Sequence, residues 1–367
     1  MTRLLIVDDS PLMRRLLSGI FTPEEGFEVA VARDGAEALA MLHSFAPDVI
    51  TLDVHMPELD GIACLDRIMV ERPSPVVMVS GRTAEGAAET MTALELGAVD
   101  FVAKPDGAVS LEIEGLRPLL LDKVRTAAAA RVPASTRLAD RVRARTGRPA
   151  RPARKGRTGT VVSDRPAERL PAVAATDAPG LVLVGTSTGG PRALELLLTP
   201  LPADFPWPIL VAQHMPAFFT GALAARLNKL CALEVVEVSA PATVVPGTVY
   251  VARGEADLVV RRRGETLVAS AAPADPDYPW HPSADRLVRS ALAAMPAERL
   301  VGVLMTGMGN DGAAAMTELK AGGGRTVAEA EESAVVWGMP GELVKLGGAS
   351  AVAPADQIAG LLVEALA

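Results

Sequence analysis

The sequence predicts two consecutive α/β domains, each built around a parallel β-sheet that is covered by helices. Short apolar runs alternate with stretches of helical periodicity in two separate parts of the chain, which is typical of βαβ units. A segment rich in arginine and proline separates these parts and contains no aromatic residue. The chain has 367 residues, of which 49% are hydrophobic, so each domain can bury a core of its own.

The first domain, residues 1–125, is predicted from five apolar runs with helical stretches between them. The runs span residues 4–7, 27–32, 49–52, 76–79 and 100–103, and the second is the weakest. Such an alternation favours a parallel sheet with helices on both faces. We therefore expect a doubly wound α/β domain.

Residues 126–179 are predicted to form a linker. Eleven arginines lie between Arg131 and Arg169, and six prolines occur between residues 133 and 179. A segment of this composition buries little apolar surface, so we expect a solvated tether. Its positive charge leaves open a contact with a partner or with a flanking domain.

Residues 180–367 are predicted to form the second α/β domain. Apolar runs at 181–184, 208–212, 248–252 and 300–305 are separated by helical stretches such as 218–230 and 284–294. We expect a second doubly wound parallel sheet, although the two domains share no motif and no internal repeat is present.

Composition and charge exclude several classes of protein. The net charge of −8 gives no general reason to expect binding of nucleic acid. The two cysteines, Cys64 and Cys231, show no metal-ligand spacing and predict no disulfide framework. The amino terminus turns acidic too early for a signal peptide, and no run of about 18 uncharged apolar residues predicts a membrane span. We expect a cytoplasmic protein with no direct membrane insertion.

Charged and hydroxyl side chains stand at the ends of the predicted strands of the first domain. In chain order they are Asp8 and Asp9, Asp53, Ser80 and Lys104. Ligands of an open parallel sheet bind at the carboxyl ends of its strands, so we expect these side chains to converge. Clustered carboxylates repel one another, which Mg²⁺ would relieve, and a carboxylate can accept a phosphoryl group. Each residue alone is more often structural, since Ser10 and Pro11, for example, form an ordinary helix start.

As a set, these residues resemble the receiver domain of a response regulator, which has a flavodoxin-like fold. The resemblance rests on Asp8 and Asp9, the segment 53–61, Ser80, and Lys104 with Pro105. It implies a histidine kinase as phosphodonor and a set of roles: phosphorylation at Asp53, Mg²⁺ binding by Asp8, Asp9 and Asp53, phosphate contact by Lys104, and switching by Ser80 and Phe101.

The turn after the first strand of the second domain carries a nucleophile motif. Residues 185–189 read Gly-Thr-Ser-Thr-Gly, which matches the G-x-S-x-G turn that exposes a serine, here Ser187. The helix that follows would present backbone amides to a developing oxyanion. The motif is weak alone, because nucleotide-binding loops are glycine-rich too, but neither G-x-G-x-x-G nor a phosphate-loop lysine is present.

A serine nucleophile needs a base, and two of the four histidines lie in the second domain. His214 ends an apolar run at the sheet edge predicted for Ser187, so we prefer it, whereas a structural role suits His281 in its loop. Asp311 follows the run 300–305 and is the candidate that orients the imidazole. The chain order differs from that of the α/β-hydrolases, which argues against their fold but not against the chemistry.

These segments together resemble the catalytic domain of the chemotaxis receptor methylesterases, the CheB family. The resemblance rests on residues 185–190, 213–216 and 306–312, and further on 227–230, 281–283 and 335–340. The family often has alanine where this chain has Thr186, a β-branched residue beside the nucleophile. The resemblance implies this site: Ser187 as nucleophile, His214 as general base and acid, Asp311 as its orienting partner, and Thr188 and Met308 lining the site near the oxyanion.

The two resemblances imply a phosphorylation-activated hydrolase that serves receptor adaptation. It would remove methyl esters from glutamates of methyl-accepting chemotaxis receptors and deamidate glutamines, with no cofactor for the esterase reaction. Phosphorylation of Asp53 is expected to open access to the catalytic face. The sequence leaves open the particular receptor, the balance of the two activities, the oligomeric state and the role of the linker.

Two other classes of function compete with this interpretation. A transcriptional response regulator would need a basic, helical output module, and the positive charge lies in the linker instead. A dinucleotide-dependent enzyme would use a similar sheet but lacks its fingerprint here.

Overall fold

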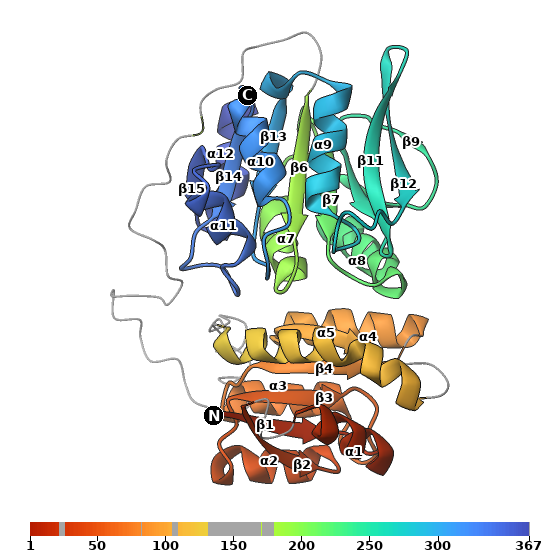
Figure 1. Ribbon diagram of the computed structural model, residues 1–367, viewed down its shortest axis with the longest axis vertical. Coiled ribbons are helices and arrows are strands. Elements are labelled where there is room, and N and C mark those ends of the chain that lie inside the picture. The colour runs from red at the N-terminus through yellow and green to blue at the C-terminus, as the bar shows by residue number, and fades with distance from the viewer. Residues whose placement is uncertain (22–25, 82, 105–108, 131–169, 171–179, 367) are drawn as a thin grey trace. The chain divides into compact units, whose positions relative to one another are not determined.

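The computed structural model describes residues 1–21, 26–81, 83–104, 109–130, 170 and 180–366. The chain divides into two compact units, Met1–Val162 and Ser163–Ala367, and each is described by itself (Figure 1). Most of the predicted linker lies outside the described residues. The last helix of the first unit continues to Ala129, four residues past the predicted boundary at residue 125.

The first unit is a five-stranded parallel sheet between two layers of helices, with strand order β2-β1-β3-β4-β5. Helices α1 and α5 pack together, while α2, α3 and α4 pack in sequence. This strand order and helix packing confirm the flavodoxin-like, doubly wound prediction. The elements are β1 Thr2–Val7, α1 Pro11–Ile20, β2 Phe27–Ala32, α2 Gly35–Ser44, β3 Val49–Asp53, α3 Gly61–Glu71, β4 Val76–Ser80, α4 Ala84–Leu96, β5 Asp100–Ala103 and α5 Val109–Ala129.

Local sequence fixes where helices α1 to α4 begin. Ser10, Asp34, Asp60 and Thr83 each accept a hydrogen bond from the backbone N–H three residues further on, which caps the helix that follows. Strands β3 and β4 are buried along their whole length, as expected for the centre of a parallel sheet. Their carboxyl ends are thereby held rigidly.

The second unit contains a seven-stranded sheet with the order β15-β14-β13-β6-β7-β10-β8 and a three-stranded sheet with the order β11-β12-β9. Its strands are β6 Leu181–Thr186, β7 Ile209–Gln213, β8 Glu234–Val238, β9 Ala242–Thr243, β10 Thr248–Ala252, β11 Ala256–Arg263, β12 Thr266–Pro273, β13 Leu300–Leu304, β14 Arg325–Glu329 and β15 Ala351–Ala353. Its α-helices are α7 Gly190–Leu198, α8 Ala217–Leu230, α9 Ala284–Ala294, α10 Ala313–Ala321, α11 Met339–Lys345 and α12 Ala355–Leu366.

The chain changes direction across the large sheet at β6. Strand β7 pairs with one side of β6 and β13 with the other, both in parallel. Helices α9, α10 and α11 pack as one group, and α7, α8 and α12 as another, so the sheet is doubly wound (Figure 1). Ligands of such sheets bind in the crevice outside the carboxyl ends of the strands at this switch point. The ends of β6, β7 and β13 are therefore the expected place for a site.

The small antiparallel sheet was not predicted from the sequence. Strands β11 and β12 pair from Ala256 opposite Pro273 to Arg263 opposite Thr266, and α9 packs on β11. Residues 257–260 of β11 are buried, but its three terminal arginines are exposed. The arginines interrupt the apolar pattern, because the hairpin extends beyond the core into solvent.

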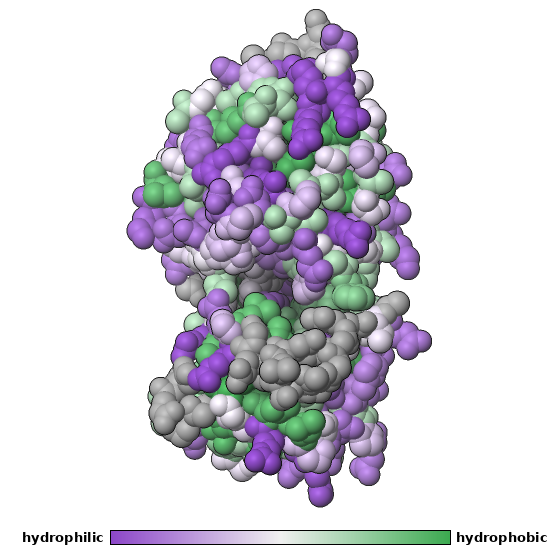
Figure 2. All heavy atoms as spheres, turned by 45° about the vertical axis from the view of Figure 1, so that its right-hand side comes forward, coloured by the Kyte–Doolittle hydropathy of each residue, from purple (hydrophilic) through white to green (hydrophobic). Residues whose placement is uncertain are grey.

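No helix in the described part of the chain is long and apolar enough to cross a membrane. Figure 2 shows hydrophilic residues over much of the visible face of the second unit, with hydrophobic ones in small separate groups between them.

Candidate active site and receiver site

The acidic residues of the first unit converge as predicted. Ligand atoms of Asp8, Asp9 and Asp53 all lie within 4.8 Å of one another at the carboxyl ends of β1 and β3. The Lys104 ammonium lies 2.7 Å from Asp53 Oδ2 and 3.1 Å from Asp8 Oδ2. A Cβ on Gly61 would collide with the Asp53 carbonyl, so only glycine permits this close approach.

Burial controls the charges in this cluster. Desolvation raises the pKa of Asp53 above its ordinary value, and the neighbouring Lys104 offsets this only in part. Burial lowers the pKa of Lys104, but the carboxylates of Asp53 and Asp8 outweigh it, so that pKa is raised. Three carboxylates provide the oxygen ligands that Mg²⁺ prefers, and a divalent ion would relieve their repulsion. The residues present therefore fit a magnesium ion.

The two predicted switch residues are both buried. The Ser80 hydroxyl, at the end of β4, donates to the Gly86 carbonyl of α4 at 3.2 Å. The Phe101 ring on β5 lies under the Lys123 ammonium, 5.4 Å from its centroid. Both residues thus connect the edge of the sheet to neighbouring helices.

In the second unit, Ser187 occupies the turn between β6 and α7. Its N–H donates to the Thr306 carbonyl at 3.0 Å, and its carbonyl accepts the Gly190 N–H at 2.8 Å. Gly189 closes the turn with a φ of 78°, in the left-handed region that glycine adopts without strain. The turn therefore holds Ser187 half-buried at the carboxyl end of β6.

His214 stands at the neighbouring strand end. Thr186 pairs with Gln213 across β6 and β7, and the His214 N–H donates to the Thr186 carbonyl at 3.0 Å. The Gln213 side-chain amide donates to the carbonyls of Ser187 and His214, both at 3.0 Å. Its oxygen accepts the Thr186 hydroxyl at 2.6 Å. The Thr186 side chain thus joins the end of β6 to the end of β7, directly before the Ser187 turn.

The imidazole of His214 is oriented by Asp311. Its Nε2 lies 2.8 Å from Asp311 Oδ2, and only 10% of the His214 side chain is exposed. A carboxylate can only accept, so Nε2 carries the proton and Nδ1 keeps its lone pair. Nδ1 is buried and has no hydrogen-bond partner among the described residues. The Trp280 indole stacks on the ring, with centroids 5.8 Å apart and planes 4° from parallel.

Asp311 is held by donors fixed to the start of α9. Ser283 Oγ donates to its carboxylate at 2.9 Å, and the backbone amides of Ala284 and Asp285 donate at 2.6 and 3.0 Å. Burial alone would raise the pKa of Asp311, but the His214 hydrogen bond and these amides hold it below its ordinary value. The carboxylate therefore stays charged while it orients the imidazole.

The remaining predicted residues are also located in this unit. Thr188 is buried, and its carbonyl accepts the Thr306 hydroxyl at 2.9 Å. Met308 is partly buried in the loop that joins Thr306 to Asp311. His281 Nδ1 lies 3.1 Å from Asp257, a buried carboxylate on β11, which agrees with a structural role.

Sequence reasoning missed several residues around this site. No role was predicted for Trp280, Ser283 or Thr306, although the segments 281–283 and 306–312 support the family resemblance, because their contacts come from segments far apart in the chain. The sequence offers a weak indication of a role for Trp280, because aromatic residues are rare in this chain, at 3%, and this one stands in a loop beside His281. The amides at the start of α9 carry no sequence signal.

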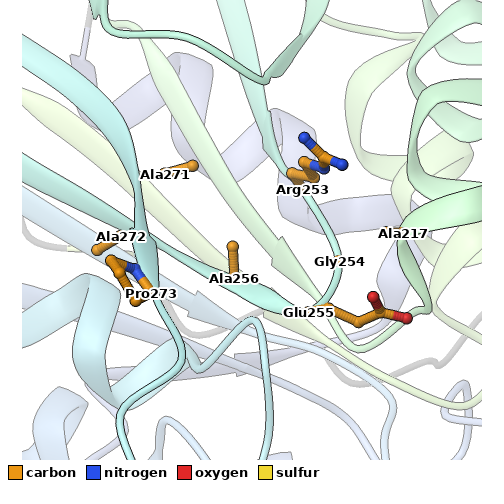
Figure 3. A pocket seen from close by; sticks show the side chains of 8 residues that line it. All are labelled: Ala217, Arg253, Gly254, Glu255, Ala256, Ala271, Ala272 and Pro273. Atoms are coloured by element: carbon orange, nitrogen blue, oxygen red, sulfur yellow. The ribbon is translucent and has the colours of Figure 1, made fainter.

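A separate cavity of about 320 Å³ opens beside the start of α8. Figure 3 shows Arg253 and Glu255 on the segment between β10 and β11, with small side chains of β12 on the other side. None of the residues predicted for catalysis lines it, so it is distinct from the Ser187 turn. Its lining is Ala217, Arg253, Gly254, Glu255, Ala256, Ala271, Ala272 and Pro273.

Comparison with known proteins finds a different family model in each unit. The model of the CheB methylesterase family matches residues 182–362, and that of the response regulator receiver domain matches residues 4–112. The second unit is similar to the crystal structure of the Thermotoga maritima CheB methylesterase catalytic domain. The two share 36% identity with a TM-score of 0.50, over 51% of this chain and 98% of that one.

Two full-length relatives extend the similarity over the whole chain. A protein-glutamate methylesterase/protein-glutamine glutaminase of Rhodopseudomonas palustris is 56% identical, over 99% of this chain and 98% of the relative. One from Rhodospirillum rubrum is 54% identical, over 99% of this chain and 95% of its own. These matches set aside a DNA-binding output domain and a dinucleotide-dependent enzyme. The chain belongs to the family of protein-glutamate methylesterases/protein-glutamine glutaminases that carry a receiver domain.

Proposed function

We propose that Ser187, His214 and Asp311 hydrolyse glutamate methyl esters, and glutamine amides, on methyl-accepting chemotaxis receptors in the cytoplasm. The observation that carries the proposal is the His214–Asp311 pair, which leaves Nδ1 of the imidazole as the basic atom. The backbone of His214 is bonded to Thr186, the residue before Ser187. The family of the chain supports the choice of substrate.

The acylation step follows from this arrangement. His214 Nδ1 takes the Ser187 hydroxyl proton while Oγ bonds to the ester carbonyl carbon, and the imidazolium is stabilised by Asp311. Backbone amides at the start of α7, with Thr188 and Met308 near the oxyanion, stabilise the negative oxygen. Nδ1–H then gives its proton to the departing methoxide, which leaves as methanol, or to the departing amine, which leaves as ammonia.

Deacylation uses the same groups in reverse. Water attacks the acyl carbon as Nδ1 takes one of its protons, and the Ser187 Oγ then leaves with that proton. The product is a glutamate carboxylate, with one further proton released to solvent. The Trp280 ring covers one face of the imidazole and limits its rotation during both steps.

The receiver would control this reaction by phosphorylation at Asp53 from a histidine kinase. Asp8, Asp9 and Asp53 would hold Mg²⁺, which neutralises charge during phosphoryl transfer. Lys104, whose ammonium lies 2.7 Å from Asp53 Oδ2, would contact a phosphoryl group on Asp53. Ser80 and Phe101 would transmit the change to α4 and α5. The proposed outcome is a shift in population that opens the catalytic domain to receptor.

Methanol release from methylated receptor membranes tests both halves of the proposal. We expect release by wild type that rises with a small phosphodonor, none from Ser187→Ala, and release from Asp53→Asn that does not respond to the phosphodonor. A Ser187→Ala protein as active as wild type would overturn the nucleophile assignment. A phosphodonor response that survives in Asp53→Asn would remove the proposed control site.

A further inference from the structure

A buried carboxyl group lies behind the nucleophile turn and has no place in the proposed chemistry. Glu329 ends β14 and is 1% exposed. Its Oε2 accepts the Thr306 N–H at 2.7 Å, and its Oε1 accepts the Ser333 hydroxyl at 2.8 Å. Burying a carboxyl is costly unless its hydrogen bonds are satisfied, so its presence here calls for a structural reason.

Thr306 connects this carboxyl to the turn that carries Ser187. Its carbonyl accepts the Ser187 N–H at 3.0 Å, and its hydroxyl donates to the Thr188 carbonyl at 2.9 Å. Glu329 thus bonds to the amide of Thr306, while two other atoms of Thr306 bond to consecutive residues of the nucleophile turn. Thr306 therefore links the end of β14 to the turn that carries Ser187.

The segment that follows β14 reinforces the same contact. The Val336 N–H donates to the Thr306 hydroxyl at 3.0 Å, and Gly307 forms a parallel bridge with Trp337. The Trp337 indole N–H returns to the Glu329 carbonyl at 2.8 Å. A Cβ on Gly307 would stand 2.7 Å from that of Ser187, so a small shift of this segment reaches the nucleophile.

We infer that Glu329 is a positioning residue for Ser187, acting through the Thr306 backbone amide. The inference rests on the proposed role of Ser187 as nucleophile. Glu329 does not approach the reacting atoms, and what it supplies is a fixed acceptor for an otherwise unsatisfied buried N–H. Losing that acceptor would let residues 306 and 307 move and would misalign the Ser187 turn.

The hydrogen-bond pattern accommodates both protonation states of Glu329. When ionised, Oε1 accepts from Ser333; when protonated, it donates to Ser333 Oγ, whose own hydrogen then turns to the Ala330 carbonyl 3.1 Å away. Burial raises the pKa of Glu329 to about 7, which agrees with a group that no charged hydrogen-bond partner stabilises. In both states Oε2 still accepts from Thr306, so an amide side chain should serve equally well.

The test compares three variants of the full-length protein with wild type. Glu329→Gln keeps the acceptor for Thr306 and a donor for Ser333. Glu329→Leu keeps most of the volume and removes the acceptor. Thr326→Val is the matched control, because it removes buried hydrogen bonds to Gly348 and Ser350 at the other end of β14 without touching the Ser187 turn.

Each variant is assayed below its melting temperature for kcat and KM of methanol release and for the rate at which a fluorophosphonate labels Ser187. We expect Glu329→Leu to lose about 10- to 100-fold in kcat and in labelling rate with little change in KM, as for a misplaced nucleophile. Glu329→Gln should restore both rates, and Thr326→Val should leave both unchanged.

Two results would overturn the inference. One is a Glu329→Leu protein that matches wild type in kcat and in labelling; the other is an equal loss in Glu329→Leu and Thr326→Val, which would reveal a structural role alone. Absence of methanol release from wild type would count against the proposed substrate instead. The labelling rates would still decide whether Glu329 positions Ser187.

Discussion

Two buried aspartates, Asp53 and Asp311, lie near strand ends of their own sheets but in opposite electrostatic settings. Asp53 faces the carboxylate of Asp8 and is balanced by one flexible ammonium, that of Lys104. Asp311 receives two backbone amides, a hydroxyl and an imidazole N–H from fixed positions. As a result, the pKa of Asp53 is raised and that of Asp311 is lowered.

The difference shows what each site is arranged to do. A bound cation stabilises a carboxylate that has a raised pKa and lies among like charges. Such a carboxylate can also act as a nucleophile and accept a phosphoryl group. A carboxylate saturated with rigid donors has a permanent charge and little freedom, which suits the partner of a catalytic imidazole. Asp53 is the last residue of β3, whereas Asp311 lies in the loop after β13, and their surroundings suit the proposed switch in one unit and the proposed fixed support in the other.

The largest effect that this contrast predicts is on Asp311→Asn. The asparagine NH₂ group must oppose at least one of the donors around it, and the imidazole loses the partner that fixes its tautomer. We expect kcat for methanol release to fall by about a thousandfold to ten-thousandfold, measured without phosphodonor. Asp53→Asn neutralises the other aspartate and should keep this unstimulated release.

A comparable loss of kcat in Asp311→Asn and Asp53→Asn would contradict the contrast between the two sites, since both aspartates would then support the esterase reaction directly. Circular dichroism of both proteins, recorded at the assay temperature, establishes that the folded state is being compared.

The residues at the strand ends could be predicted from sequence because a parallel sheet brings such ends together. Asp8, Asp53, Ser187 and His214 each follow an apolar run, and topology alone makes them neighbours of other strand ends. The seven-stranded sheet was predicted in outline for the same reason. Three of its strands, β8, β14 and β15, were not predicted, because glutamates interrupt β8, polar residues end β14, and β15 has only three residues.

The supporting residues could not be predicted, because their roles depend on tertiary contacts with little local signature. Ser283 looks like an ordinary helix cap until α9 is placed beside Asp311. Glu329 stands in the acidic run Glu329, Glu331 and Glu332, which the sequence alone presents as a solvated surface. Only the pairing of β13 with β14 buries the first of them behind Thr306.

Glu329 is a third buried carboxyl, and its raised pKa should make stability depend on pH in the opposite sense to Asp311. Its pKa is about 7 in the folded protein against an ordinary 4.5, so the folded state retains a proton that the unfolded state releases. The free energy of unfolding should therefore fall as pH rises from about 4.5 to 7, by on the order of 3 kcal/mol. Glu329→Gln should lack this component, so its stability relative to wild type should increase across the window.

Denaturant unfolding of both proteins at several pH values between 4.5 and 8 measures this difference, in which the other titrating groups cancel. Asp311 should have the opposite sign, because its lowered pKa contributes stability that is lost as pH falls. A Glu329→Gln difference that does not vary with pH would mean that Glu329 titrates at its ordinary pKa despite its burial.

The smallest effect concerns a single donor of the Asp311 site. Ser283→Ala removes the hydroxyl that donates to Asp311 and also the cap of α9, while the amides of Ala284 and Asp285 remain. One hydrogen bond to a charged group corresponds to about a tenfold loss in kcat, and the missing cap to about 1 kcal/mol of stability.

Ser290→Ala, on the same helix, is the control: it removes bonds to Val260 and Leu287 without touching Asp311, so its stability should fall but its kcat should not. If Ser283→Ala keeps full kcat, the remaining donors hold Asp311 by themselves, and its rigidity arises from the backbone of α9.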